Sequence, residues 1–228
     1  MNFPKGGRKK IAWVRVEGVL FRQGALSLAA YLAANAQGFS DRIIKFGIVA
    51  LAQPLCQLFL HKGDAGLASR LGFFALRDMS EDRVFVLGKE YFDNILRDAL
   101  LPEGLDLLRR LRREGQEIHL YSESLGCALQ YLPPHLKEET RLSCNQLEFS
   151  QGMATGKLVA PILGGYAGTN YLLQQAQQEG YDLAHSSAYS SVERDMLLLN
   201  AVGNPCAVNP TSALRREARQ LDWPIMEY

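Results

Sequence analysis

The sequence lacks the cysteine and histidine spacings that mark a zinc site or a disulfide framework. No two of its four cysteines form a CxxC pair, and its four histidines show no metal-ligand spacing. The cysteines are Cys56, Cys127, Cys144 and Cys206. We expect reduced, buried thiols, which are typical of a cytoplasmic protein.

The sequence also lacks an excess of charge of either sign. It has 25 basic and 24 acidic residues in 228, a formal net charge of +1. With so small a net charge, the protein has no overall electrostatic attraction to nucleic acid, so no nucleic-acid partner is expected. Any binding site must therefore depend on a local group of residues. With 47% hydrophobic residues the chain is long and apolar enough for a substantial core.

No stretch has the length and continuity of a membrane anchor or a secretion signal. A basic run at 5–10 precedes an apolar segment, but Arg15 and Glu17 interrupt that segment, which disfavours secretion. Residues 46–60 carry no charge, yet they are shorter than the roughly 20 residues that a span needs. We predict a packed helix pair broken near Pro54, with contact to a membrane surface as the less favoured alternative.

The order of elements predicts an α/β fold. A strand at 10–16 is followed by helical patterns from 24 to about 100, including helices at 67–76 and 83–96. Strands and helices then alternate to the C-terminus. Helices are expected at 102–115, 168–179, 193–201 and 211–221, strands at 117–122, 187–190, 205–208 and 223–226, and a hairpin at 141–160.

This alternation is typical of a mainly parallel sheet flanked by helices, because parallel neighbours need crossover connections. Ligands of such sheets lie beyond the carboxyl ends of the strands. The prediction therefore places four segments at one rim: residues 15–18, 122–124, 190–195 and the loop before a helix beginning near Gly168.

Several short strings occur in the order and spacing of a known family. They include IHLYSES at 118–124, NQLEF at 145–149, GMATG at 152–156, DMLLL at 195–199 and AVGNP at 201–205. In this respect the chain resembles the haloacid dehalogenase superfamily, in particular its phosphoserine-phosphatase-like subfamily IB. The resemblance implies a Rossmann-like core made of residues 1–22 and 100–228, with an all-helical cap inserted at 23–99.

The first family motif has two aspartates two residues apart, the nucleophile and the general acid and base, where this chain has Arg15 and Glu17. An arginine stays protonated and cannot attack phosphorus, whereas Glu17 could still move a proton. Ser122 matches the second motif, a hydroxyl that binds the phosphoryl group. The third motif is a lysine, and its position is taken by Thr169.

The fourth motif supplies acidic ligands to magnesium, and here it retains Asp195 but has Ser191 at the more important position. A cation at position 15 and a neutral side chain at 191 disfavour a divalent ion, so no cofactor is expected although the family uses Mg²⁺. We therefore predict a pseudophosphatase that acts as a binding or interaction protein. The alternative is a phosphomonoester hydrolase with altered chemistry that uses Glu17 or Asp195.

The residue patterns leave the role of each candidate open. Arg15 is either an anion-binding group or half of an internal ion pair with Glu17 or Asp195. The resemblance makes Ser122, Glu123, Ser124 and Gly168 candidates for substrate binding, whereas turn hydrogen bonds account equally well for the serines.

The partners implied are an anionic or phosphorylated small molecule, or another protein. A basic run at 109–113 is expected to be a solvated helix face, with an acidic partner as the other interpretation.

Overall fold

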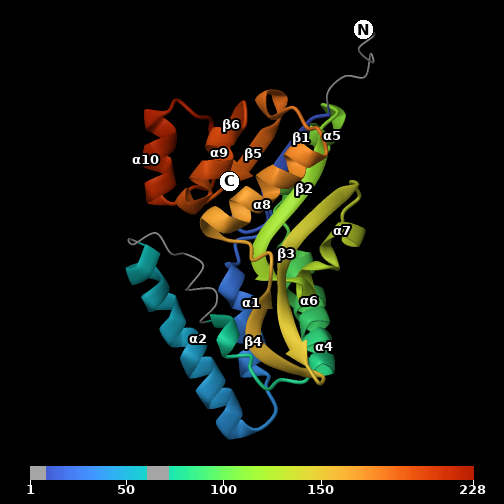
Figure 1. Ribbon diagram of the computed structural model, residues 1–228, viewed down its shortest axis with the longest axis vertical. Coiled ribbons are helices and arrows are strands. Elements are labelled where there is room, and N and C mark those ends of the chain that lie inside the picture. The colour runs from blue at the N-terminus through green and yellow to red at the C-terminus, as the bar shows by residue number, and fades with distance from the viewer. Residues whose placement is uncertain (1–8, 61–71) are drawn as a thin grey trace.

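The computed structural model describes residues 9–60 and 72–228. A seven-stranded sheet forms the core of the protein, and all of its strands except the β3–β4 hairpin lie in the upper part of the view in Figure 1. In spatial order its strands are β4 (Met153–Val159), β3 (Thr140–Ser150), β2 (Glu117–Leu125), β1 (Ile11–Arg15), β5 (Ser187–Ser190), β6 (Asn204–Val208) and β7 (Ile225–Met226). All neighbours are parallel except the antiparallel pair of β3 and β4, so the predicted α/β class is confirmed.

Strand β1 lies at the centre of the parallel part of the sheet, between β2 and β5. All five of its residues are buried, as expected for a strand covered on both faces. Ile11 and Trp13 point to one face, whereas Ala12 and Val14 point to the other. This period of two places the next odd-numbered residue, Arg15, on the Trp13 face at the carboxyl end of the strand.

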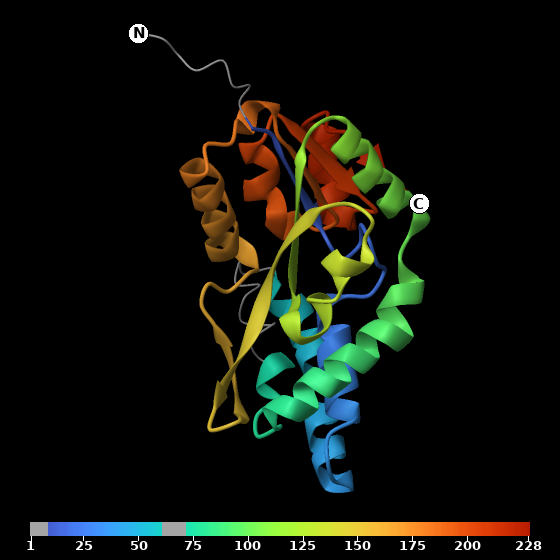
Figure 2. The same ribbon diagram turned by 90° about the vertical axis from the view of Figure 1, so that its right-hand side faces the viewer.

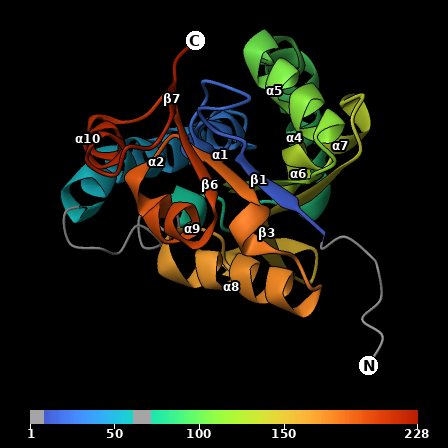
Figure 3. The same ribbon diagram turned by 90° about the horizontal axis from the view of Figure 1, so that it is seen from above.

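Helices cover both faces of the sheet (Figure 3). The Trp13 face is covered by α8 (Gly165–Gln178), α9 (Met196–Ala201) and α10 (Ser212–Gln220), whose apolar residues share one cluster. Helix α5 (Pro102–Arg113) lies on the opposite face, where Leu107, Leu108 and Leu111 are buried. Short segments complete the core: α6 (Gly126–Leu129), α7 (Leu132–His135), and the 3-10 turns Leu183–His185 and Glu193–Asp195.

The chain between β1 and α5 is helical. It contains α1 (Ala25–Ala34), α2 (Phe39–Leu60), α4 (Glu81–Tyr91), η1 (Phe92–Leu96) and η2 (Arg97–Ala99). These helices lie below the sheet, and the β3–β4 hairpin extends down beside them (Figures 1 and 2). The backbone of Met79 accepts a 2.8 Å hydrogen bond from Ala154, which ties the helical segment to the hairpin.

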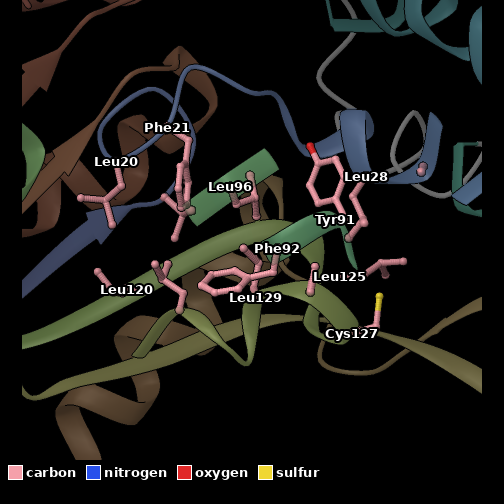
Figure 4. Packing of buried hydrophobic residues seen from close by; sticks show 14 of the residues in the cluster. Leu20, Phe21, Leu28, Tyr91, Phe92, Leu96, Leu120, Leu125, Cys127 and Leu129 are labelled. Carbon is pink, nitrogen blue, oxygen red and sulfur yellow. The ribbon is translucent and has the colours of Figure 1, made fainter. Parts of the chain in front are cut away.

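Apolar residues of this helical segment and of the sheet form one continuous cluster (Figure 4). Leu28, Tyr91 and Phe92 from the helices meet Leu120 and Leu125 from β2 within it. The helices are therefore held against the core by buried apolar surface, which stabilises a contact in proportion to its area.

Most predicted elements match observed ones within a few residues, but two predictions are wrong. The helix expected to break near Pro54 continues as the single helix α2. Proline removes one backbone donor, and the remaining hydrogen bonds of the ladder carry the helix past it. Helix α8 begins at Gly165, three residues before the predicted start at Gly168.

Part of the helix predicted at 67–76 lies outside the described residues. Among the described helices, none combines the length and apolarity needed to cross a membrane.

Two helical glycines give a matched test of this packing. A Cβ on Gly88 of α4 would lie 2.6 Å from the backbone oxygen of Cys127, whereas one on Gly47 of α2 would meet nothing within 4 Å. We expect Gly88→Ala to destabilise the protein by about 1–3 kcal/mol through overpacking. Gly47→Ala is expected to stabilise it by up to about 1 kcal/mol. Urea unfolding monitored by circular dichroism measures both, and equal effects would contradict the packing.

Candidate functional site

The carboxyl ends of β1, β2 and β5 meet at a buried cluster of charged side chains. Arg15 ends β1, Glu123 lies near the end of β2, and Asp195 follows β5. The exposed fractions of these residues are 1%, 3% and 4%. The segments at 15–18, 122–124 and 190–195 thus lie together at one rim of the sheet, as predicted. The guanidinium of Arg15 lies at the centre of this rim and is enclosed by protein.

Asp195 is the bidentate partner of Arg15. The Nη1 atom of Arg15 donates to both carboxylate oxygens, at 3.2 Å and 3.0 Å. One of those oxygens also accepts from the Tyr121 hydroxyl at 2.7 Å and from the Ser190 hydroxyl at 2.5 Å. Four hydrogen bonds therefore reach one buried carboxylate, which compensates the loss of its hydration.

Glu123 holds the other end of the guanidinium. Its Oε1 atom accepts from Arg15 Nη2 at 3.0 Å and from Arg194 Nε at 2.5 Å. The pKa of Glu123 is lowered: burial opposes ionisation, but the charges of Arg194 and Arg15 and their hydrogen bonds outweigh it. Arg194 is less buried than Arg15 and connects the cluster to the surface.

Glu17 lies on the third side of Arg15 and is held more weakly. Its Oε2 atom is 3.6 Å from Arg15 Nε, and neither atom has a hydrogen-bond partner among the described residues. Its Oε1 atom accepts a hydrogen bond from the Ser122 hydroxyl. Burial raises the pKa of Glu17, and Arg15 and Ser122 only partly offset that effect. Protonation of Glu17 would balance the two guanidinium and three carboxyl groups described in this cluster.

The remaining predicted residues occupy structural positions around the cluster. Ser122 is fully buried and also accepts from the Ser124 backbone N–H at 2.9 Å. Ser191 donates to the backbone oxygen of Glu17 at 2.9 Å. A Cβ on Gly18, whose φ is +81°, would lie 2.3 Å from the Ser191 hydroxyl, so this close approach requires glycine.

Thr169 and Gly168 lie inside the first turns of α8, and both are buried. Gly168 was expected at the start of this helix. Instead Gly164 precedes the helix, and a Cβ there would lie 3.3 Å from the Glu123 carboxyl carbon. The loop therefore approaches Glu123 at Gly164, and substrate binding at Gly168 stays a prediction.

Four residues of the site were not singled out as candidates from the sequence, although two of them lie in the predicted rim segment 190–195: Tyr121, Ser190, Arg194 and Asn145. Tyr121 and Glu123 are two apart on β2, so strand periodicity could have indicated that both reach Arg15. Asn145 donates to the backbone oxygens of Glu123 and Leu163 at 2.7 Å and 3.0 Å and accepts from Leu163 N–H at 2.7 Å. No local pattern indicates that role, because it depends on tertiary contacts.

Within the described part of the chain, no group of three or more His, Cys, Asp or Glu side chains is arranged to hold a metal ion. Glu17, Glu123 and Asp195 each form an ion pair with the guanidinium of Arg15. The arrangement can hold a buried charge and can take up a proton at Glu17, but it offers a divalent cation no free set of oxygen ligands.

Comparison with curated proteins finds relatives among phosphatases. A phosphoserine phosphatase of Mycobacterium tuberculosis is 29% identical over 164 residues, covering 72% of this chain and 52% of the relative. An inhibition of morphological differentiation protein of Streptomyces azureus is 30% identical over 144 residues, covering 61% and 52%. The chain thus spans about half the length of these curated relatives. No protein-family model matches it.

Solved structures give the same fold over nearly the whole chain. A substrate-bound phosphoserine phosphatase has a TM-score of 0.71 at 16% identity and covers 98% of this chain and 95% of its own. A protein of unknown function from Bordetella pertussis has a TM-score of 0.78 at 19% identity, covering 96% and 98%. The chain is thus similar in sequence to phosphoserine phosphatases, and it shares their fold.

The raised pKa of Glu17 predicts a pH-dependent contribution to stability. Because the folded pKa lies above the ordinary value of 4.5, the native state holds the proton more tightly than the unfolded chain. This contribution is complete below pH 4.5 and is lost as pH rises through the folded pKa. We expect Glu17→Gln, which cannot ionise, to gain stability relative to the wild type as pH rises.

Urea unfolding between pH 4 and pH 8 measures this difference, on the order of 1 kcal/mol for each unit by which the pKa is raised. Glu90→Gln, at an exposed glutamate of α4, is the control and should leave the profile unchanged. A difference between Glu17→Gln and wild type that is constant with pH would contradict the assignment.

Proposed function

We propose that this chain is a pseudophosphatase: it keeps the phosphatase scaffold, lacks phosphomonoesterase chemistry, and acts as a binding or interaction protein. The single observation that carries the proposal is the enclosed guanidinium of Arg15, bonded to Asp195 and Glu123 where the family has its nucleophile and metal. The similarity to phosphoserine phosphatases supports the scaffold, and the replacement of motif residues in this chain supports the loss of activity.

The first support for this proposal is that the carboxylates of the cluster already accept hydrogen bonds from protein groups. A magnesium ion would shield phosphoryl oxygens and orient the phosphate, and it needs carboxylates that accept little else. Asp195 already accepts four hydrogen bonds, and Glu123 already accepts two from guanidinium groups. Binding the ion would require Arg15 to give up these partners inside a buried site, which is strongly unfavourable.

The second support is the lack of a nucleophile at the end of β1. Arg15 has no lone pair to attack phosphorus and remains protonated. Burial opposes the charged form of Arg15, but the charges of Asp195, Glu123 and Glu17 outweigh it and raise the pKa of Arg15 well above its ordinary value. Loss of the nucleophile alone lowers turnover by about a millionfold in a well-studied covalent hydrolase.

A second candidate function is a hydrolase that activates water directly with Glu17 or Asp195. The observation that favours it is the raised pKa of Glu17 beside the Ser122 hydroxyl, because a carboxyl group with such a pKa suits proton transfer. Asp195 is a poor candidate base because its oxygens are already engaged. Both carboxyl groups are also more than nine-tenths buried, which limits the access of water and substrate.

The functional test is phosphate release from phosphoserine and p-nitrophenyl phosphate in the presence of Mg²⁺. We expect the wild type to release no more phosphate than Glu17→Gln does. The Arg15→Asp, Thr169→Lys, Ser191→Asp triple variant restores the charges of the family motifs and is expected to gain Mg²⁺-dependent activity. Wild-type turnover that Glu17→Gln abolishes would instead establish the hydrolase.

If the triple variant folds poorly, a measurement of Mg²⁺ binding tests the proposal without it. The wild-type melting temperature should not change with Mg²⁺, because Arg15 already neutralises the carboxylates. Arg15→Asp alone adds a carboxylate to the cluster, so it should be less stable without the ion and recover several degrees with it. A wild-type melting temperature that rises with Mg²⁺, but not with matched ionic strength from NaCl, would contradict the proposal.

A further inference from the structure

A hollow of about 610 Å³ lies away from the charged cluster, at the amino end of β6. It is lined by the turn before β6, by the residues that precede β7 and by Arg110 of α5. Because β5 and β6 are parallel, this hollow lies toward the opposite rim of the sheet from Arg15 and Asp195. Its volume is within the range of about 300–1,000 Å³ that is typical of sites for small ligands.

The walls of the hollow combine apolar and polar side chains. On the α5 face of the sheet its apolar wall is formed by Tyr189, Cys206 and Met226, whereas Trp223 packs against the cluster on the opposite face. Tyr189 and Cys206 belong to the sheet and are buried, with exposed fractions of 7% and 5%. Such walls suit a planar apolar body, because ring faces stack and pack with little cost in side-chain entropy.

Among the described residues that line the hollow, Arg110 is the one cation. Its neighbours on α5, Arg109 and Arg112, form ion pairs at 2.6 Å with Asp106 and Glu139. Arg110 lies 3.9 Å from the carboxylate of Glu114, and its side chain is 48% exposed. Its charge also acts on the hollow: burial raises the pKa of the Tyr189 hydroxyl, and Arg110 partly offsets that effect.

We propose that this hollow binds a small aromatic carboxylate, with its ring against Tyr189 and Met226, which pack on the α5 face of the sheet, and its carboxylate on Arg110. A single guanidinium matches one carboxylate through two parallel hydrogen bonds. A phosphate dianion suits the hollow less well, because one arginine leaves it half neutralised and the wall also contains Asp222. The proposal does not depend on whether the charged cluster hydrolyses phosphate.

Isothermal titration calorimetry with three probes tests the proposal on the wild-type protein. Phenylacetate has both the ring and the carboxylate, phenylacetamide lacks the charge, and acetate lacks the ring. We expect phenylacetate to bind and the other two to bind at least about tenfold more weakly, because each lacks one of the two contacts.

Variants on α5 then identify the cation. Arg110→Gln should weaken phenylacetate about tenfold or more, whereas Arg113→Gln, an exposed arginine on the same helix that does not line the hollow, should not change it. Equal weakening in both variants would mean a general charge effect and would overturn the proposal.

Methyl NMR of the methionines locates the bound ring. Met226 lines the hollow, whereas Met153 is 41% exposed on the distant β4. A shift of the Met226 resonance on titration with phenylacetate, without one at Met153, is the expected result, and Met226→Leu provides the assignment. No binding of phenylacetate, equal binding of phenylacetamide, or an unchanged Met226 resonance would each overturn the proposal.

Discussion

A guanidinium group enclosed at the centre of the sheet is the constraint on which this site depends. Arg15 ends a strand that is buried along its whole length, and only 1% of its surface is exposed. A charge withdrawn from water in this way is tolerated only when ion pairs and hydrogen bonds replace its hydration. Asp195 and Glu123 provide both, and Glu17 adds a third, weaker partner.

The architecture around this charge places its partners from far-separated parts of the chain. The parallel register pairs Arg15 with Tyr121, and the strand period then brings Glu123 to the same face. Asn145 fixes the loop before α8 against the backbone of Glu123, and the absence of a side chain at Gly164 lets that loop come close. The rim of the sheet, where ligands of parallel α/β folds commonly bind, is thus organised here around an internal cation. A shared fold therefore does not by itself determine function.

Much of this fold could be predicted from local patterns, because hydrophobic periodicity and turn residues determine the strands and helices. The helix at 102–115 is an example: proline begins it, glycine follows it, and the observed helix is Pro102–Arg113. Pro54 shows the limit of such rules, since a residue that usually ends a helix lies within α2. The division into a core and a helical insertion at 23–99 stays a prediction.

The site was predicted in outline, because motif positions 15, 17, 122 and 195 do converge. The interpretation of Arg15 as part of an internal ion pair agrees with the geometry. Besides Asp195, however, the residue that hydrogen-bonds Arg15 is Glu123, whereas Glu17 lies farther away. Arg194 and Tyr121 were missed because their roles arise from the side-chain directions of a folded rim, which the sequence alone does not specify. The hollow beside Arg110 was missed for the same reason.

The most direct test of this account is a double-mutant cycle between Arg15 and Asp195, with unfolding free energy as the readout. Arg15→Met and Asp195→Asn each leave a buried charge without its partner, at an expected cost of about 3–5 kcal/mol. The account predicts that the double variant loses far less than the two losses combined, by about 2 kcal/mol or more. Losses that add to within about 0.5 kcal/mol would contradict it, because independent residues behave in that way.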